Sequence, residues 1–136
     1  MEITNPVLIK REETNSVKTS SGEFLEYISW KQCKQLGLGI GIHKKRFPKD
    51  GYLQSKKVDE AVMLLNGKGS IIIKSGEREK KFPLCQHAIM FIPKMTLFCF
   101  SPEPEMEILS ATGPAWFPKQ QSGLDYRRKE SGRIIL

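Results

Sequence analysis

At 136 residues, the chain is long enough for a single domain with one substantial core. Hydrophobic residues make up 39% and aromatic residues 9% of it, which is the composition of a globular and not of a disordered protein. No apolar run approaches the roughly 20 residues that a membrane helix needs, and the N-terminal stretch lacks the apolar region of a signal peptide. We therefore expect a cytoplasmic protein with no membrane partner.

The net charge is +7, from 22 basic and 15 acidic residues, and such an excess favours encounters with anionic ligands or surfaces. Basic residues cluster at 44–46, 56–57, 80–81 and 127–129. Because these clusters lack interleaved aromatic residues and any known nucleic-acid motif, we expect no nucleic-acid partner and interpret them as solvated strand ends or the rim of an anion site. The three cysteines form no C-x-x-C pair, which argues against a disulfide framework.

The first predicted elements lie between residues 6 and 30. Residues 6–9 form a short apolar patch, which adds a strand either to a barrel edge or to a partner subunit, and the polar stretch after it is predicted to be a loop. Residues 24–30 are predicted to form a strand, with a helix over 24–36 as the alternative.

A second strand is predicted over residues 36–42, where leucine or isoleucine alternates with glycine. Alternation with a period of two indicates one buried face, and the glycines allow the strong curvature of a small barrel. His43 shares the face of the glycines. If Leu38 and Ile40 point toward the core, His43 points outward, to the surface or to an interface.

The central part of the chain carries the clearest strand signals. A tight turn is predicted at 48–51, and two strands are predicted over 61–65 and 70–73, separated by an Asn-Gly-Lys-Gly turn. A charged hairpin tip follows at 75–81, and a third apolar run extends from 88 to 100. Short strands joined in this way indicate a small β-barrel.

The last part of the chain alternates short strands with turns. Residues 103–107 are predicted to be an acidic turn leading to a short strand at 108–109, and 113–118 to be an extended segment in which prolines exclude helix. The tail from 120 onward is polar and basic until Ile-Ile-Leu at 134–136, which we expect to dock on the barrel or on a second subunit.

Two of these segments resemble the motifs of the cupin superfamily. The first cupin motif ends with a glutamate, six residues and a glycine, and Glu60 and Gly67 keep that spacing. The second motif has a Gly, five residues, a Pro, one residue, a Gly, two residues and a His. Residues 87–98 keep the proline, with His87 and Met95 at the glycine positions and Phe98 at the histidine position. The segment 113–120 also resembles the strand that closes small cupins.

The resemblance covers residues 22–120 and implies an all-β, single-domain cupin-like double-stranded β-helix, that is, a jelly-roll barrel. It divides the chain into an N-terminal arm (1–21), the barrel (22–120) and a C-terminal tail (121–136). Because the N-terminal segment of many small cupins exchanges between subunits, the resemblance also implies a homodimer.

Cupin enzymes usually hold a divalent metal through two histidines and the glutamate of the first motif and the histidine of the second. Here the first two positions fall on Gln54 and Lys56, or on Leu53 and Ser55, and Phe98 occupies the last. Several imidazole, thiolate or carboxylate groups normally assemble a transition-metal site, and only Glu60 remains. We therefore expect no metal and no cofactor.

The candidate ligand-binding residues follow from strand parity, which places Gln54, Lys56 and Glu60 on one face provided that no bulge intervenes near Val58, with Phe98 and Phe100 on strands that would line the barrel. Glu60 is the candidate acid or base. It either pairs with Lys56 inside the barrel or forms hydrogen bonds at the mouth while Lys56 extends into solvent. The barrel centre is either filled by its own side chains or forms an apolar pocket. We expect His87 to support a turn.

Three functions fit this pattern. The first is a metal-free cupin-like protein that binds a small metabolite, anionic or sugar-derived, in the barrel. The second is a metal-independent isomerase or epimerase of a sugar derivative, which requires a positioned acid and base. The third is a non-catalytic dimeric scaffold, which would use the filled barrel and the apolar termini.

Overall fold

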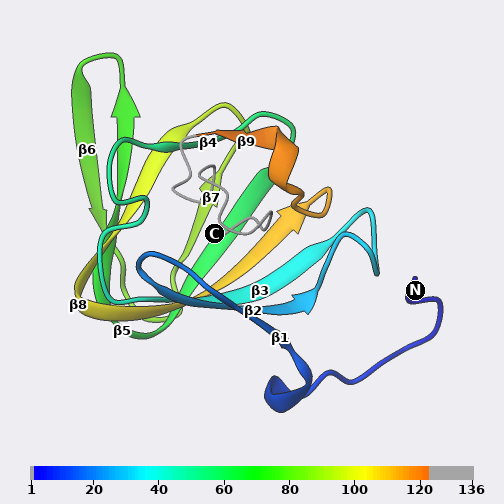
Figure 1. Cartoon of the computed structure of the whole chain (residues 1–136). Helices are drawn as coiled ribbons and strands as arrows, with labels where there is room; N and C mark the ends of the chain where they lie inside the picture. The colour runs from blue at the N-terminus through cyan, green and yellow to red at the C-terminus, as the bar shows by residue number, and fades with distance from the viewer. Residues whose placement is uncertain (1, 123–136) are drawn as a thin grey trace.

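The structure, a computed structural model, describes residues 2–122. Within this range the chain forms nine strands and two short 3₁₀ helices (Figure 1). In chain order these are η1 (Arg11–Glu13), β1 (Asn15–Lys18), β2 (Gly22–Ile28), β3 (Gly37–His43), β4 (Leu53–Ser55), β5 (Asp59–Ser75), β6 (Arg78–Pro83), β7 (Ile89–Ile92), β8 (Leu97–Gly113), η2 (Pro118–Gln120) and β9 (Gln121–Ser122). None of the described helices is long and apolar enough to cross a membrane.

The fold is organised around β5 and β8, which are each 17 residues long and pair in antiparallel fashion over nearly their whole length. The apolar runs 61–65 and 70–73 belong to one strand, so the prediction of a turn between them was wrong. The Asn-Gly-Lys-Gly sequence instead lies at two register shifts, the first with an extra residue on β5 and the second with extra residues on β8, and such irregularities bend a strand. Gly67 has a φ of +86° there, a conformation that glycine adopts readily.

β8 bends at the same place as its partner. Residues 103–107, predicted to be an acidic turn, lie inside this strand. Gly67 pairs with Met106 and Gly69 with Pro102, so the three residues 103–105 of β8 stand opposite the single residue 68 of β5. Both long strands therefore pass from one half of the curled sheet into the other without interruption.

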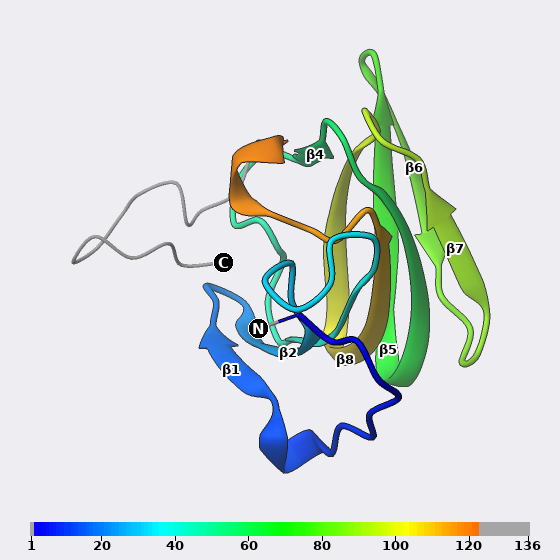
Figure 2. The same ribbon diagram turned by 90° about the vertical axis from the view of Figure 1, so that its right-hand side faces the viewer.

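The bend divides the sheet into two halves. The first half contains the N-terminal part of β5 and the C-terminal part of β8, flanked by β7 on one side and by β3, β2 and β1 on the other. The second half contains the remaining parts of β5 and β8, flanked by β6 on one side and by β4 and β9 on the other. Figure 2 shows the curl, with β6 and β7 on the side of β5 that faces away from β1 and β2.

Several predicted elements are confirmed, and the N-terminal segment differs. β2 and β3 occupy the two predicted strand regions, which excludes the helix over 24–36, and the predicted hairpin tip joins β5 to β6. The stretch predicted to be a loop contains β1, which pairs with β2. The patch 6–9 forms no strand, and Val7 and Leu8 are 58% and 83% exposed.

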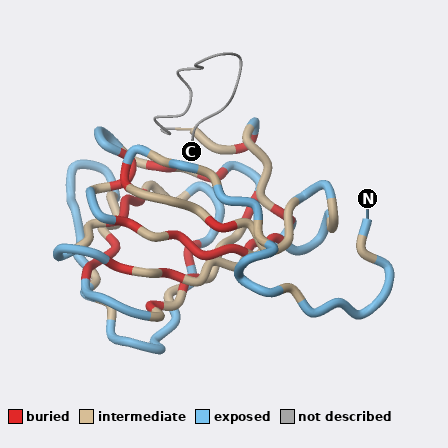
Figure 3. The backbone as a smooth tube through the Cα atoms, turned by 60° about the horizontal axis from the view of Figure 1, so that its bottom comes forward, coloured by how far each residue is buried: buried red, intermediate tan, exposed pale blue. Residues whose placement is uncertain are grey.

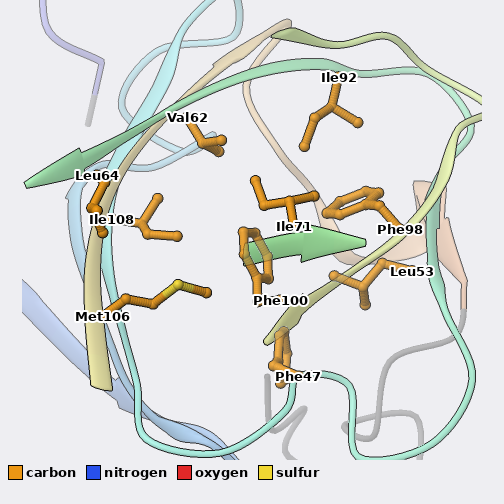
Figure 4. Close-up of a cluster of buried hydrophobic side chains, with 10 residues drawn as sticks. All are labelled: Phe47, Leu53, Val62, Leu64, Ile71, Ile92, Phe98, Phe100, Met106 and Ile108. Atoms are coloured by element: carbon orange, nitrogen blue, oxygen red, sulfur yellow. The ribbon is translucent and has the colours of Figure 1, made fainter. Parts of the chain in front are cut away.

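The hydrophobic core lies between the two halves of the sheet. Buried residues are concentrated on the strands, and turns and the N-terminal segment are largely exposed (Figure 3). Ten buried side chains form one cluster (Figure 4): Phe47, Leu53, Val62, Leu64, Ile71, Ile92, Phe98, Phe100, Met106 and Ile108. Both halves of β5 and of β8 contribute to it, so this cluster holds the two halves together.

We expect Phe98→Leu to lower the free energy of unfolding by about 1–2 kcal/mol, because it removes ring atoms from a core position that is 1% exposed. Urea unfolding measures this change. Phe91→Leu is the matched control, since Phe91 is 61% exposed, and it should alter stability by less than about 0.5 kcal/mol. Equal losses in the two variants would contradict the burial described for Phe98.

Candidate functional site

A cavity of about 100 Å³ lies beside the core, against the concave face of the first half of the sheet. Its floor is β3, where Gly37, Gly39 and Gly41 all line the space. Because these positions carry no side chains, the backbone itself forms the surface. A cavity of this volume is well above the roughly 10–15 Å³ that one water molecule requires, so it is large enough for a small organic group such as a sugar ring.

The register of the sheet determines what faces this glycine floor. On β8, Thr112 pairs with Gly37, Ser110 with Gly39 and Ile108 with Gly41, and the three side chains line the cavity. The inward face of β3 is therefore the glycine face. This corrects the expectation that the apolar face of β3 points toward the barrel centre and His43 away from it.

His43 is buried at the junction of the two halves of the sheet, with 6% of its surface exposed. Its ring stacks on Phe100 at 4.6 Å between centroids and on Phe47 at 5.4 Å. Nδ1 lies 2.8 Å from the hydroxyl oxygen of Ser21. Burial lowers the pKa of His43 to about 4, because removing an imidazolium from water costs free energy, so the imidazole is neutral near pH 7.

The second ring nitrogen of His43 lies over the floor of the cavity. A Cβ atom at Gly41 would come within 2.9 Å of Nε2, so the glycine leaves the room that this nitrogen occupies. Nδ1 is already engaged by Ser21. Nε2 is therefore the polar atom that His43 offers to a molecule in the cavity.

Glu60 reaches the same cavity from β5. It pairs with Thr112 across the sheet, and the Ser110 hydroxyl donates a hydrogen bond of 2.6 Å to its Oε2. Burial raises the pKa of Glu60, and the bond from Ser110 opposes that rise. Ser110, which binds the Glu60 carboxyl group, stands opposite Gly39, and His43 Nε2 lies over Gly41. Ser110 and His43 Nε2 are therefore offset by about two residues, or roughly 7 Å, along the strands.

Aromatic and polar side chains close the remaining sides. Phe24 lies over Gly39, and Glu26 follows on the same face of β2. Trp116 covers one end, with its backbone N–H donating to Thr112 Oγ1 at 3.1 Å and its indole N–H donating to Gln121 Oε1 at 2.9 Å. Among the described residues that line the cavity there are two carboxyl groups and one imidazole, and no lysine or arginine.

Of the five residues predicted to bind a ligand, the structure brings Glu60 and Phe100 to this cavity. Phe98 lies in the core cluster. Gln54 instead donates a 3.0 Å hydrogen bond to the Met95 carbonyl. Lys56 is exposed and makes no described ion pair with Glu60.

Strand parity failed between Lys56 and Glu60 for a structural reason. β4 ends at Ser55 and β5 begins at Asp59, so residues 56–58 connect two strands and do not preserve the alternation of faces. His87 occupies a turn with a φ of +69°, where its backbone N–H donates to the Leu64 carbonyl at 3.0 Å. It lies outside the cavity lining.

Sequence reasoning did not select His43, Ser110, Thr112 or Trp116 as site residues. The signal that points to His43 is the Gly-x-Gly-x-Gly-x-His alternation, because three glycines on one face of a strand make a hollow beside the next side chain on that face. For Ser110 and Thr112 the signal is weaker. They are polar residues at alternate positions of an otherwise apolar strand end.

The described residues do not fit the metal centre that cupin enzymes usually carry. Across residues 2–122 no group of three or more His, Cys, Asp and Glu side chains lies close enough to hold a metal ion. At the positions of the family's ligands, Lys56 is exposed and Phe98 is packed in the core. The described lining of the cavity offers Glu60, His43 and the neighbouring hydroxyl groups instead.

Solved structures with the same architecture identify the fold. A variant of Pac13 from Streptomyces, solved with uridine, matches with a TM-score of 0.73 over 98% of this chain and 95% of that chain, at 12% identity. Another Pac13 structure describes that protein as a nucleoside dehydratase. The chain has the cupin-like barrel fold. This confirms the predicted fold class.

Two further matches support the assignment of a cupin-like barrel. A protein from Planctomyces limnophilus matches with a TM-score of 0.71 at 14% identity, over 86% of this chain and 96% of that chain. The capsular polysaccharide assembling protein CapF from Staphylococcus aureus matches with a TM-score of 0.65 at 16% identity, over 79% of this chain and 30% of the longer CapF chain. No protein-family model and no curated protein sequence matches the chain.

We expect Gly39→Ala to lower the stability of the cupin-like barrel by about 1–2 kcal/mol. A Cβ atom there would lie 2.3 Å from Cζ of Phe24 and 2.9 Å from the Leu25 carbonyl oxygen, so the aromatic ring has to leave the cavity wall. Thermal unfolding measures the effect. Gly113→Ala is the control because its Cβ would meet nothing closer than 3.8 Å. If Gly39→Ala lowers the stability no more than Gly113→Ala does, the close packing of Phe24 over Gly39 would be refuted.

Proposed function

We propose that the barrel cavity binds a small, uncharged, sugar-derived metabolite of the nucleoside type. The observation that carries this proposal is the composition of the wall. Two carboxyl groups, an imidazole and several hydroxyl groups, those of Ser110 and Thr112 among them, line the cavity beside a floor of bare backbone and the rings of Phe24, Phe100 and Trp116. Ligand sites typically combine an apolar lining with a few placed polar groups.

The polar groups suit a ligand that carries several hydroxyl groups. Glu60 accepts hydrogen bonds, Ser110 and Thr112 both donate and accept, and His43 presents one ring nitrogen. Aromatic rings beside these groups would contact the apolar faces of a sugar or stack on a planar base. The structural likeness to Pac13, which was solved with uridine, supports this class of ligand.

The charge of the wall favours a neutral ligand over an anionic one. Glu26 and Glu60 are the ionisable acids of the described lining, and no described cation stands beside them. A phosphate or carboxylate placed here would lose its hydration without a charged partner, which is costly. The net charge of +7 is therefore expected to act on the outer surface and not on the choice of ligand.

A thermal-shift panel tests the proposal. It should contain uridine, other nucleosides, free pentoses and the corresponding 5′-phosphates, because a ligand that binds only the native state raises its apparent stability. Stabilisation by neutral members and not by their phosphates is the expected result. Stabilisation by the phosphates alone, or by no member, would overturn the proposal.

Acid–base catalysis on the bound molecule is a second candidate function. It is favoured by one observation, namely that Glu60 and His43 face the same cavity while burial moves their pKa values in opposite directions. Perturbed titratable groups in one pocket are typical of catalytic sites. Incubation of each stabilising compound with the protein, followed by mass spectrometry and proton exchange in heavy water, tests for dehydration or epimerisation.

A further inference from the structure

The buried hydrogen bonds behind His43 determine which of its ring nitrogens carries the proton. A neutral imidazole has one N–H donor and one acceptor nitrogen, and the two forms offer opposite chemistry to a ligand. The tautomer of His43 depends on three contacts that Thr19 Oγ1 makes with Ser21 and Gly22, in the turn between β1 and β2.

Thr19 begins the chain of contacts. Its Oγ1 accepts hydrogen bonds from two backbone N–H groups, that of Gly22 at 2.9 Å and that of Ser21 at 3.2 Å. A hydroxyl oxygen has two lone pairs, so both are used. The remaining contact of Thr19 Oγ1, at 3.2 Å from Ser21 Oγ, is therefore one in which Thr19 donates its hydroxyl proton.

The Ser21 oxygen accepts this hydrogen bond from Thr19. The Ser21 hydroxyl group therefore needs a different acceptor for its own proton. Ser21 is 2% exposed, and its other described side-chain partner is His43 Nδ1 at 2.8 Å. If His43 donated from Nδ1, the Ser21 hydroxyl would be a buried donor without a described acceptor, at a cost of about 1–3 kcal/mol. If Ser21 donates to Nδ1, the hydroxyl groups of Thr19 and Ser21 and the Nδ1 nitrogen all have partners, and Nε2–H faces the cavity.

We infer that Thr19 and Ser21 hold His43 as the Nε2–H tautomer, so that the imidazole presents a hydrogen-bond donor to the cavity. Thr19 and Ser21 are thus positioning residues. The tautomer itself is a property of the free protein. The further step, that Nε2–H donates to an oxygen atom of the ligand, rests on the proposed function. It assigns proton acceptance in the cavity to Glu60 and polarisation of a ligand oxygen to neutral His43, a role that a neutral imidazole can fill.

Nitrogen-15 NMR of histidine-labelled protein tests the inference directly, since the sequence contains only two histidines. His43→Gln assigns the signals. We expect His43 to show a protonated, pyrrole-type Nε2 and an unprotonated, pyridine-type Nδ1 that is shifted by its hydrogen bond. A pyrrole-type Nδ1 would overturn the inference in the native protein, whatever any variant does.

The Ser21→Ala variant tests the relay. It removes the donor to Nδ1, so the Nδ1 resonance should move toward that of a nitrogen without a hydrogen bond or of a mixture of tautomers, whereas Ser16→Ala, on exposed β1, should move neither ring-nitrogen resonance. An unchanged Nδ1 in Ser21→Ala would show that Ser21 does not donate to it. Titration with uridine tests the contact between Nε2–H and the ligand separately from the tautomer. Stabilisation by uridine without a shift of the Nε2 proton would refute the ligand contact alone, and failure of the whole panel would refute the proposed function but not the tautomer.

Discussion

Replacing Glu60 with glutamine is expected to weaken binding of uridine, or of the panel compound that stabilises most, by roughly 100-fold, or about 2.7 kcal/mol. Glutamine keeps the shape of the side chain and the contact with Ser110, whose hydroxyl reaches Oε2 at 2.6 Å. It loses the carboxylate that strengthens a hydrogen bond from a ligand hydroxyl. Isothermal titration calorimetry measures the loss.

The same substitution is expected to raise the stability of the free protein near neutral pH. Burial raises the pKa of Glu60, so the carboxyl contributes stability below its unfolded value of 4.5 and loses it as the pH rises through the folded value. Glutamine has no proton to lose. Weaker binding together with equal or greater stability distinguishes a ligand-binding residue from a structural one. Glu77→Gln, at the exposed hairpin tip, is the control, and equal affinity in both variants would remove Glu60 from the site.

Lowering the pH from about 6.5 to about 4 is expected to destabilise the protein by about 3 kcal/mol through His43. The pKa of this imidazole is lowered from 6.5 to about 4 by burial, so within this window the unfolded chain binds a proton that the native state does not. Stability therefore falls as the pH decreases, and it does so only between these two values. At about 1.36 kcal/mol per pKa unit, the difference gives the expected magnitude.

Urea unfolding at a series of pH values measures this dependence, and comparison of variants isolates it from the carboxylates. His43→Gln should lack the loss below pH 6.5, while His87→Gln, which removes an exposed histidine, should retain it. A wild-type NMR titration of His43 provides an independent reading should His43→Gln fail to fold. Parallel pH profiles for wild type and His43→Gln, or titration of His43 near pH 6.5, would contradict the buried neutral imidazole.

The sequence carried enough information to predict the strands because their apolar residues alternate or cluster over short runs. It did not reveal that β5 and β8 are continuous, because Asn-Gly-Lys-Gly and the acidic segment 103–107 have the composition of turns. In isolation each would be a turn. Opposite one another they form one bend, since the 14 Cα pairs of the register between β5 and β8 continue on both sides of it. Long-range pairing, and not local propensity, decided the outcome.

The site was only partly predictable. Glu60 was selected through a motif spacing, and it lines the cavity. His43 was assigned to the wrong face because the larger residues of β3 were assumed to face the barrel centre. The reverse holds, since the glycine face leaves the space that Phe24 and the imidazole occupy. Which face of a strand is buried depends on what packs against it, and that information lies in other strands.

β5 and β8 run through both halves of the curled sheet, and this continuity affects how the protein unfolds. Each half of the curled sheet takes its central pair from the same two strands, so loss of one half would leave the other with β5 and β8 anchored at one end only. The core cluster also draws on both halves. We therefore expect the two halves to unfold together, as small single domains usually do, and the cavity, whose wall joins β3, β5 and β8, to open with the barrel and not through a local lid.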